Sequence, residues 1–432
     1  MSAFFPWKIL HIELSRGISP LPPEEGIGGI YLVFWWHGIP LGHQEIPANR
    51  LPMPLSSVRE LVLKTISIPV GDHLFDKGFQ ASLPVVSKKH PKAEPPDFEN
   101  LIALARPLEE LHIRYALPSN STHSAPVSIV ICTRNRPEQL DACLRSIQEL
   151  TQPPQEIIVV DNNPSSEATR LLVRKTPNVN YVLEPRPGLS AARNAGIRHA
   201  RAEIIAFTDD DVTVHPDWIA RLQQGFENPK VMAVTGPVLP AELETEAQFI
   251  FQHIHGRSGW GFRKLLFNDK FFEQMKNRGV PVWQIGAGAN MAFRRIGFEL
   301  IGGFDERLGA GACGCSEDSE MWYRVLSKNW FCFYEPTAVV FHHHRREIID
   351  LHRQMFQYMR GHMAALLIQF EKHRHWGNLY RAFVTLPHYY ARLFLKHASK
   401  GFKPRESSLG AQVLGCLAGV TFYLKHRSGA KK

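Results

Sequence analysis

Residues 203–211 read EIIAFTDDD, a short apolar run that ends in three consecutive aspartates. Two similar runs lie upstream, at residues 127–132 (VSIVIC) and 156–160 (EIIVV), and helical stretches separate the three. Strands that alternate with helices in this way are typical of parallel β–α units. Because the runs are apolar along nearly their whole length, both faces of the sheet should be covered. The sequence therefore predicts an α/β fold with a Rossmann-like, mostly parallel sheet and helices on both faces.

Polar side chains follow each of these runs directly. In open α/β sheets ligands bind outside the carboxyl ends of the strands, so we expect the polar clusters to share one nucleotide-type site. No G-x-G-x-x-G follows the first run, which disfavours a dinucleotide-dependent dehydrogenase, whose pyrophosphate rests on that glycine turn. The three clusters are Thr133-Arg134-Asn135, Asp161-Asn162-Asn163 and Asp209-Asp210-Asp211.

The aspartate triplet is the strongest chemical signal. In extended backbone, residues two apart point to one side, so Asp209 and Asp211 can face one ligand while Asp210 faces away. Carboxylate oxygens suit Mg²⁺ or Mn²⁺, ions that usually complete their coordination with phosphate and water. The triplet thus predicts a metal–diphosphate site. The alternative is an acidic turn before the helix expected near Pro216.

Two further groups of candidates lie nearer the C-terminus. Gly288 and Asn290 belong to the segment GAGAN, whose glycines let the backbone approach a ligand closely. His342 and His344 follow an apolar run and share a face if the chain is extended, where imidazole can join the carboxylates at Mn²⁺. A solvated basic patch is the alternative for the histidines, and a plain loop is the alternative for the glycine segment.

Five segments, in this order, resemble the family 2 glycosyltransferases, which have the GT-A fold. The resemblance covers about residues 128–344, and the ordered set is more specific than any one motif. The segments are SIVICTRNRPEQLDACLRSI, EIIVVDNN, RPGLSAARNAGIRHARAEIIAFTDDD, GAGANMAFRR and GGFDERLGAG…SEDSEMWYRV.

The resemblance implies a role for each matching residue. Asp209 and Asp211 correspond to the family's D-x-D pair, with Asp211 the direct metal ligand. Asp318 corresponds to the catalytic base, with Glu317 beside it as the other catalytic candidate. The implied donor-binding residues are Thr133, Arg134 and Asn135 around the nucleotide, Asp161 at the base or ribose, Arg193 and Asn194 beside the nucleotide or diphosphate, and Asp210, Gly288 and Asn290.

The implied roles agree with elementary chemistry. A hydroxyl is a poor nucleophile until a base removes its proton, and a carboxylate near the acceptor can do so. A divalent metal neutralises the charge of the departing nucleoside diphosphate. One base and one metal predict a single displacement with inversion, from a nucleotide-diphospho-sugar to a hydroxyl of a glycan, polysaccharide or lipid-linked acceptor. No Q-x-x-R-W follows Asp318, which favours a non-processive enzyme.

Two other functions remain open. A sugar-phosphate nucleotidyltransferase is disfavoured because no glycine-rich loop with Arg or Lys follows the first run. A degenerate binding module of the same fold, on a membrane or a partner, is disfavoured because both acidic elements are present. For the acidic helix start at 316–320, a Ser-capped first turn is a structural explanation that is compatible with catalysis.

Composition divides the remaining chain. The net charge is +9, yet residues 342–432 carry 16 Lys and Arg against 4 Asp and Glu, so the basicity is C-terminal. We therefore expect no nucleic acid partner for the rest of the chain. At the C-terminus the aromatic residues fit helical packing better than a platform for stacking bases, so we expect none there either. The expected parts are a small β-containing accessory domain (1–117), a polar linker (118–126), the catalytic domain (127–345) and a basic helical extension (346–432).

The last uncharged run, residues 409–424, has basic flanks on both sides. It is shorter than the roughly 20 residues that cross a bilayer as a helix. Basic flanks suit a helix lying on anionic lipid headgroups, whereas packing on the catalytic domain and membrane spanning are the alternatives. Six cysteines are too few for a disulfide scaffold, so we expect a cytoplasmic protein, peripheral on the cytoplasmic membrane face if the run binds lipid.

Overall fold

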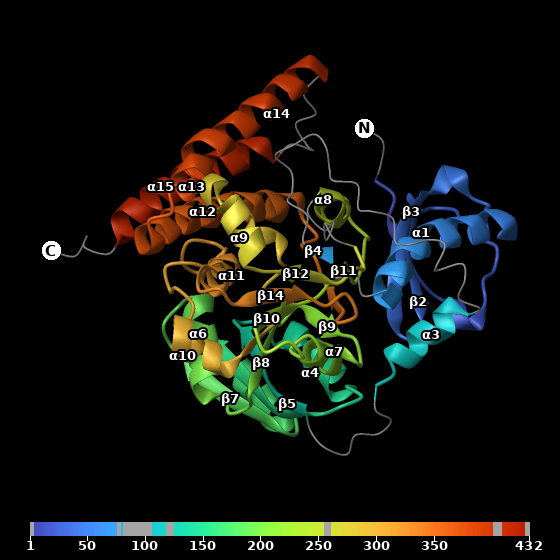
Figure 1. Ribbon diagram of the computed structural model, residues 1–432, viewed down its shortest axis with the longest axis horizontal. Coiled ribbons are helices and arrows are strands. Elements are labelled where there is room, and N and C mark those ends of the chain that lie inside the picture. Colours follow the sequence, from blue (N-terminus) through green and yellow to red (C-terminus); the bar gives the residue numbers. More distant parts are fainter. Residues whose placement is uncertain are drawn as a thin grey trace.

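The computed structural model of the protein describes residues 4–75, 79–80, 106–117, 125–254, 261–400 and 408–427. Figure 1 shows a small N-terminal part in blue, a central α/β domain, and a group of C-terminal helices in orange and red. The N-terminal part and the C-terminal helices lie on different sides of the central domain (Figure 1).

The central domain is built on a mixed sheet of nine strands in the described residues, in the order β4-β12-β14-β10-β13-β8-β5-β6-β7. The apolar runs form parallel neighbours: β5 (Ala125–Thr133), β6 (Pro154–Asn162), β7 (Val179–Glu184) and β8 (Ile204–Asp209). The parallel order ends at β13 (Met291–Arg294), which runs antiparallel to both β8 and β10. The other strands are β4 (Phe79–Gln80), β10 (Val231–Thr235), β12 (Leu265–Phe267) and β14 (Phe331–Tyr334).

Alternate residues of each strand contribute to two cores, so both faces of the sheet are covered, as predicted. In β5, Val130 and Cys132 pack in one core, and Ile129 and Ile131 pack in the other. The first core lies under α6 (Leu189–His199), α9 (Asp269–Met275) and α11 (Glu317–Ser327). The second lies under α4 (Pro137–Gln148), α5 (Ala168–Lys175) and α7 (Trp218–Gln224).

A second, three-stranded sheet of the central domain has the order β11-β15-β9. Its strands are β11 (Val238–Pro240), β15 (Val340–His342) and β9 (Val212–Val214). β9 begins directly after Asp211 and is antiparallel to β15, with Val212 opposite His342. This register brings the end of the acidic triplet beside a histidine that lies 131 positions later in the chain.

The N-terminal part has its own sheet and its own apolar core. β2 (Gly29–Trp36) and β3 (Ile39–Pro47) form an antiparallel pair, and β1 (Trp7–Glu13) adds in parallel to β2. Tyr31, Val33 and Trp35 point to the opposite face, where they pack with Leu239 and Val339 of the central domain. Helices α1 (Leu55–Phe75) and α3 (Pro107–Arg114) complete this part.

The C-terminal helices pack on the central domain through α12 (Ile348–His373), which contacts α11. α15 (Leu409–His426) lies along α12, and two glycines permit the close approach. A Cβ at Gly415 would lie 2.3 Å from the carbonyl oxygen of Phe356, and one at Gly419 would lie 2.5 Å from that of Arg360. In the sequence, α12 and α15 are separated by α13 (Gly377–Tyr380), a π-helical turn (Arg381–Thr385) and α14 (Leu386–Lys400).

The uncharged run therefore packs on the protein with one side. Its opposite side is exposed, because Leu414 and Leu417 are about 60% accessible. None of the described helices combines the length and the apolar character needed to span a bilayer. The other described elements are the short helices α8 (Glu246–Ile254), α10 (Arg295–Ile301), η1 (Leu14–Arg16), η2 (Ala48–Arg50), η3 (Lys276–Arg278) and η4 (Val282–Gln284).

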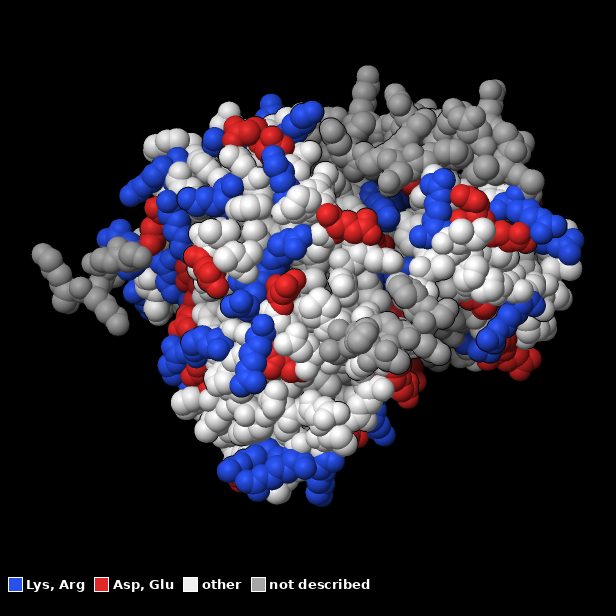
Figure 2. Space-filling view, turned by 60° about the horizontal axis from the view of Figure 1, so that its bottom comes forward, with Lys and Arg blue, Asp and Glu red and all other residues white. Residues whose placement is uncertain are grey.

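The α/β fold class with its small β-containing N-terminal part and helical C-terminal region is confirmed. The first strand of the central domain begins at Ala125, inside the expected linker, and residues 118–124 of that linker lie outside the described residues. On the face shown in Figure 2, basic and acidic side chains are intermixed across the surface. The charge of this face is therefore not concentrated in one large patch.

Candidate active site

The acidic triplet lies at the carboxyl end of β8, beside the end of β5. Asp209 is the last residue of β8, and the turn that follows presents Asp210 and Asp211. Thr133 Oγ1 donates a hydrogen bond to Asp210 at 2.8 Å, and the Arg136 guanidinium pairs with Asp210 and Asp211, each at 3.1 Å. Burial, together with the charge of Asp211, raises the pKa of Asp210 to about 6.

Asp211 and His342 face each other across β9 and β15. Asp211 Oδ1 and His342 Nε2 are 3.3 Å apart. Burial disfavours the charged form of Asp211, but the hydrogen bond and charge of His342 outweigh it and lower the carboxyl pKa. Burial would likewise lower the pKa of His342, yet Asp211 raises it.

The 3.3 Å between Asp211 Oδ1 and His342 Nε2 suits two adjacent ligand positions on a divalent ion. Ligand atoms at about 2.1 Å from an octahedral Mg²⁺, and at right angles, lie roughly 3 Å apart. Among the described residues, no three side chains of His, Cys, Asp or Glu are grouped to hold a metal by themselves. Such a pair suits an ion that takes its remaining ligands from substrate phosphates and water.

His344 does not join Asp211, which corrects the expectation that it is a metal ligand. Its Nδ1 lies 2.9 Å from His342 Nδ1, and its Nε2 lies 3.2 Å from Gln252 Oε1. Both ring nitrogens are therefore engaged behind His342. The strand alternation was predicted correctly, but the contacts of the second histidine were not.

Arg193, in α6, connects the two acidic elements. Its guanidinium is buried and pairs with Glu317 at 2.7 Å and with Asp209 at 3.3 Å. It also donates to the carbonyl oxygen of Gly288 at 3.2 Å. A Cβ at Gly288 would lie 2.8 Å from this guanidinium, so a larger residue at this position would displace the Arg193 side chain. Arg193 therefore contacts two segments that are distant in the sequence, at Gly288, 95 residues away, and at Glu317, 124 residues away.

Glu317 and Asp318 begin α11 but have different surroundings. Glu317 is buried, and one of its oxygens has no hydrogen-bond partner among the described residues. Burial raises the pKa of Glu317 to about 7 although Arg193 opposes the shift. Asp318 is half-buried, accepts a hydrogen bond from the backbone of Ser319 at 2.6 Å, and has a pKa raised by burial. Ser316 has a φ of 70° and makes no side-chain cap, so the expected serine cap is wrong.

Asp161 is the next-to-last residue of β6 and is fully buried. One carboxyl oxygen accepts a hydrogen bond from the Tyr181 hydroxyl at 3.0 Å, and the other has no partner among the described residues. Burial raises the pKa of Asp161, with Tyr181 opposing the shift. An unpaired buried oxygen at a strand end is suited to accept a ligand N–H or O–H.

Arg134 and Asn135 follow β5 as expected, and both are exposed. Asn135 has a φ of 56° and accepts hydrogen bonds from the backbone and hydroxyl of Ser165, each at 2.9 Å. Asn135 thus fastens the loops after β5 and β6 to each other.

Two expected ligand-binding residues instead hold the backbone. The Asn194 amide donates to the carbonyl of Phe304 at 2.9 Å and accepts from its N–H at 2.8 Å. The fully buried Asn290 accepts from Trp218 and donates to the carbonyls of Pro237 and Ala338. Their polar atoms are occupied by the protein, which corrects the expectation of donor contacts.

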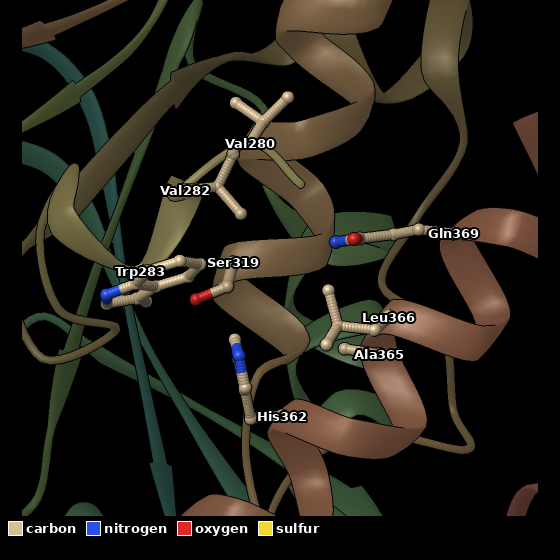
Figure 3. Close-up of a pocket in the computed structure, with 8 residues that line it drawn as sticks. All are labelled: Val280, Val282, Trp283, Ser319, His362, Ala365, Leu366 and Gln369. Carbon is tan, nitrogen blue, oxygen red and sulfur yellow. The ribbon is translucent and has the colours of Figure 1, made fainter. Parts of the chain in front are cut away.

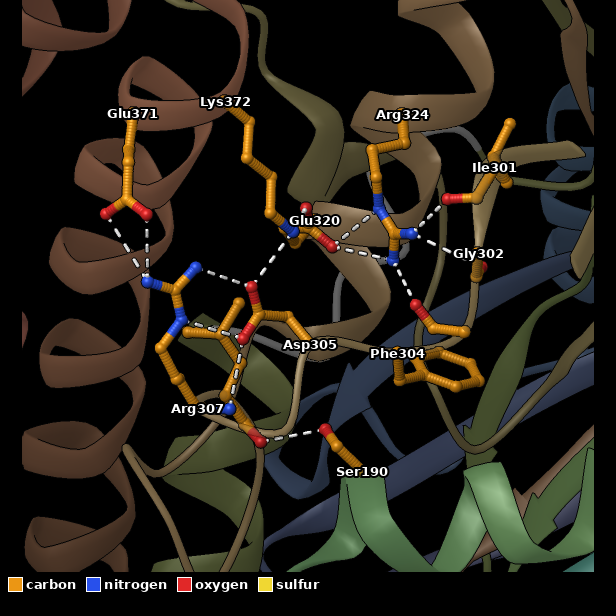
Figure 4. A network of polar contacts seen from close by, with 12 residues as sticks. Ser190, Ile301, Gly302, Phe304, Asp305, Arg307, Glu320, Arg324, Glu371 and Lys372 are labelled. Carbon is orange, nitrogen blue, oxygen red and sulfur yellow. Dashed lines mark hydrogen bonds and ion pairs between the residues drawn. The ribbon is translucent and has the colours of Figure 1, made fainter. Parts of the chain in front are cut away.

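The glycine-rich segment 302–314 is tied at its start to α11 and α12 (Figure 4). Asp305 pairs with Arg307 at 2.8 Å and with Lys372 at 2.9 Å, and Arg307 reaches Glu371 at 3.2 Å. Arg324 donates to the three successive carbonyls of residues 301–303. The C-terminal helices therefore fix one wall of the site.

A small cavity lies between η4, α11 and α12, next to Asp318 in sequence (Figure 3). Trp283, Ser319 and His362 are among the residues that line it, and its volume is about 10 Å³. That is near the lower limit for one water molecule, so this cavity is too small for a sugar. The Arg381 guanidinium, at the start of the π-helical turn, stacks on Trp283 with its central carbon 3.7 Å from the ring centre.

Two contributors were missed from the sequence. Arg136 neutralises part of the triplet, and Tyr181 orients Asp161. The sequence offers only a weak signal for them: Arg136 precedes the proline that begins α4, and Tyr181 alternates with apolar residues in β7.

Comparison with known proteins identifies the domain. Residues 128–302 match the model of the family "Glycosyl transferase family 2". Similar curated proteins include glucosyl-dolichyl phosphate glucuronosyltransferase of Haloferax volcanii, 28% identical over 42% of this chain and 57% of that protein. Succinoglycan biosynthesis protein ExoM of Rhizobium meliloti is 33% identical over 28% of this chain and 40% of that protein. The chain carries a family 2 glycosyltransferase domain.

The similarity is partial in length. Pre-mycofactocin glycosyltransferase of Mycobacterium tuberculosis is 26% identical over 57% of this chain and 49% of that protein. The chain thus spans about half the length of the curated relatives it matches. Among solved structures, a mannosyltransferase of Pyrobaculum calidifontis in complex with GDP-Man and Mn²⁺ matches 72% of this chain and 90% of that chain, with 18% identity and a TM-score of 0.48.

Proposed function

We propose that the protein transfers a sugar from a nucleotide-diphospho-sugar to a hydroxyl acceptor, with inversion and without processivity. The observation that carries this proposal is the position of Arg193 between Asp209 and Glu317. It places the carboxylates of the triplet and those at the start of α11 around one guanidinium. A single displacement requires carboxylates that bind the metal on the donor side and a carboxylate that acts as the base on the acceptor side.

Asp318 is the proposed base. Of the two acids at the start of α11, Glu317 is paired with the Arg193 guanidinium, whereas Asp318 accepts hydrogen bonds from the backbone N–H groups of Ser319 and Gly288. Asp318 accepts the proton of the attacking hydroxyl, so the oxygen can form the new bond to the anomeric carbon as the bond to the diphosphate breaks. Glu317 positions Arg193 through their ion pair. The ion pair of Arg193 with Asp209 keeps the guanidinium close to the proposed diphosphate site.

We propose that Asp211 and His342 hold Mg²⁺ or Mn²⁺. Their 3.3 Å separation suits adjacent ligand positions, and carboxylates outnumber guanidinium groups in this part of the described chain. Asp209, the other expected ligand, is bound to Arg193 and would act from further away. The bound ion supplies charge neutralisation for the departing nucleoside diphosphate.

The donor nucleotide is proposed to bind at the ends of β5 and β6. The unpaired Asp161 oxygen can accept a hydrogen bond from a base N–H or a ribose hydroxyl, and Tyr181 holds the other oxygen. Thr133 is committed to Asp210 and shapes the pocket wall. Arg134, which is exposed directly after β5, would contact the nucleotide from the solvent side.

We also propose that the protein is cytoplasmic and binds the anionic cytoplasmic face of a membrane peripherally. The support is a C-terminal apolar surface, defined here as Trp376, Tyr380, Phe383, Val384, Tyr389, Phe394 and Leu395 with Leu414, Leu417 and Leu424, all about half exposed or more. From residue 372 to the end, the sequence has one acidic residue, Glu406. Exposed aromatic and aliphatic side chains among basic ones suit an anionic lipid interface. A lipid-linked acceptor would be presented there, although a glycan or polysaccharide acceptor fits the chemistry equally.

The remaining alternative is a binding module of the same fold that does not turn over donor. A panel of nucleotide sugars with Mn²⁺ distinguishes the two, because a transferase releases nucleoside diphosphate and a binding module does not. Calorimetry of UDP and GDP with and without Mn²⁺ tests the metal part.

We expect nucleotide affinity to fall on chelation and in Asp211→Ala, since the diphosphate then meets uncompensated carboxylates. Asp141→Ala is the control, because Asp141 is an exposed carboxylate on α4 that pairs with Arg145. Affinity that is the same with and without the metal would exclude the proposed metal bridge.

A further inference from the structure

A chain of polar contacts runs from the site through the protein behind His342. His342 Nδ1 lies 2.9 Å from His344 Nδ1, and His344 Nε2 lies 3.2 Å from Gln252 Oε1. The Gln252 amide nitrogen donates to the hydroxyl of Tyr31 at 3.4 Å. His344 comes from the segment after β15, Gln252 from α8 and Tyr31 from β2 of the N-terminal sheet.

The chemistry of the groups fixes the direction of the hydrogen bonds. A carbonyl-type oxygen only accepts, so the His344 nitrogen that faces Gln252 Oε1 carries hydrogen. A neutral imidazole that carries its hydrogen on Nε2 has its lone pair on Nδ1, so the Nδ1 atom of His344 can accept a hydrogen bond. His342 Nδ1 then donates to His344, and the lone pair of a neutral His342 lies on Nε2, the atom facing Asp211.

Packing restricts each member of the chain to this arrangement. Gln252, His344 and Tyr31 are each less than 10% exposed. The ring of Phe251 lies 4.6 Å from the ring of His344, and Gln248 donates to the His344 carbonyl. The histidine pair is thus held by α8 on one side and by β15 on the other.

We infer that His344 and Gln252 are positioning residues that orient His342, so that its Nε2 lone pair points at the position between His342 and Asp211. The inference rests on the proposed function, which gives that position to a divalent ion. It also gives the N-terminal sheet a role, because Tyr31 is the last member of the chain. Partners behind a metal-binding imidazole fix its tautomer and ring orientation.

The test measures Mn²⁺ affinity from the electron paramagnetic resonance signal of free Mn²⁺, with and without UDP. In His344→Leu the acceptor for His342 Nδ1 is lost, and we expect Mn²⁺ affinity to fall roughly 10- to 100-fold. In His344→Asn the side-chain oxygen replaces Nδ1 as acceptor, so affinity should recover most of this loss. His343→Leu is the matched control, because that neighbouring side chain is about half exposed and lies outside the contact chain.

Equal Mn²⁺ affinity in His344→Leu and His343→Leu would overturn the inference, as would an His344→Asn variant as weak as His344→Leu. His342→Ala separates this outcome from failure of the proposed function. If His342→Ala binds Mn²⁺ like the wild type, the proposed metal site is wrong. If His342→Ala is impaired but His344→Leu is not, the metal site stands and the positioning role is wrong.

Nitrogen-15 NMR of the imidazole rings gives a second readout that does not depend on the metal. We expect His344 to carry hydrogen on Nε2 and not on Nδ1, and the opposite pattern would overturn the inference. Tyr31→Phe removes the last polar group of the chain and should weaken Mn²⁺ binding less than His344→Leu. If Mn²⁺ affinity is unchanged in Tyr31→Phe, the N-terminal sheet does not contribute to the orientation of His342.

Discussion

Arg193 shows why the residue type matters at the centre of the site. Its planar guanidinium reaches Glu317, Asp209 and the Gly288 carbonyl at once. A lysine ammonium is a single point charge and cannot reproduce this geometry. Because the group is buried, losing a partner leaves an uncompensated charge, which typically costs about 3–5 kcal/mol. The same contacts therefore serve both the fold and the arrangement of the carboxylates.

Asp318→Asn tests the proposed base. The amide keeps the shape of the side chain and its hydrogen bond from Ser319 but cannot accept the acceptor proton. We expect transfer to fall by roughly 10²- to 10⁴-fold, the usual range for general-base assistance. Affinity for the nucleoside diphosphate should stay near normal, because Asp161 and Asp211 are unchanged. Steady-state transfer assays and calorimetry measure the two effects separately.

The pH profile gives the same assignment an independent check. A base must be ionised, and burial raises the pKa of Asp318. The transfer rate of the wild type should therefore decline, on lowering the pH, at a higher pH than an exposed aspartate would impose. Asp350→Asn, an exposed carboxylate on α12, is the control and should behave like the wild type. Full transfer by Asp318→Asn would move the base to Glu317, and lost nucleotide affinity would place Asp318 at the metal.

At the scale of elements, the contact between α12 and α15 depends on two glycines of α15, Gly415 and Gly419, that lie against the backbone of α12. Gly419 has no room for a methyl group, because its Cβ would lie 2.5 Å from a backbone oxygen and 2.8 Å from Met363 Cβ. Gly410, in the same helix, has nothing within 4 Å of that position. Gly419 and Gly410 thus form a matched pair for testing the packing.

We expect Gly419→Ala to destabilise the protein by about 1–3 kcal/mol, the usual cost of overpacking. Gly410→Ala should be neutral or stabilising by up to about 1 kcal/mol, because alanine is the better helix former. Urea unfolding followed by circular dichroism measures both changes. Changes of the same sign and size would mean that α15 does not pack on α12 in solution as it does here.

The elements differ in how well the sequence predicts them. The parallel strands were predictable because burial on both faces makes the whole strand apolar, as in β5 and β8. The antiparallel insertion of β13 was not, since MAFR carries no sign of its direction. A motif fixes which residues lie near the site but not where each amide points, so Asn194 and Asn290 were assigned to the ligand although they bind backbone. The contacts of His344 depend on α8, which is almost 100 residues away in sequence.

At the scale of the whole molecule, the N-terminal part and the C-terminal helices lie on different sides of the central domain (Figure 1). The N-terminal sheet buries its second face against the central domain through Tyr31, Val33 and Trp35. The C-terminal apolar surface has no such cover in the described residues, and it belongs to the most basic part of the sequence. Apolar side chains among basic ones are the combination that partitions into an anionic lipid interface.

Vesicle flotation tests the membrane contact with a matched pair of double variants. Phe394→Ser with Leu395→Ser removes two exposed apolar side chains of α14. Full burial of one such side chain in an apolar environment is favourable by about 1.5–3 kcal/mol. We expect at least about tenfold weaker binding to vesicles that contain phosphatidylglycerol. Ile296→Ser with Leu300→Ser removes a similarly exposed pair on α10, far from the C-terminal apolar surface in sequence, and should float like the wild type. Because screening weakens charge attraction between exposed groups, wild-type binding should decrease in high salt and on uncharged phosphatidylcholine vesicles. If both double variants float like the wild type, α14 does not touch the bilayer and the C-terminal apolar surface must be covered by something other than lipid.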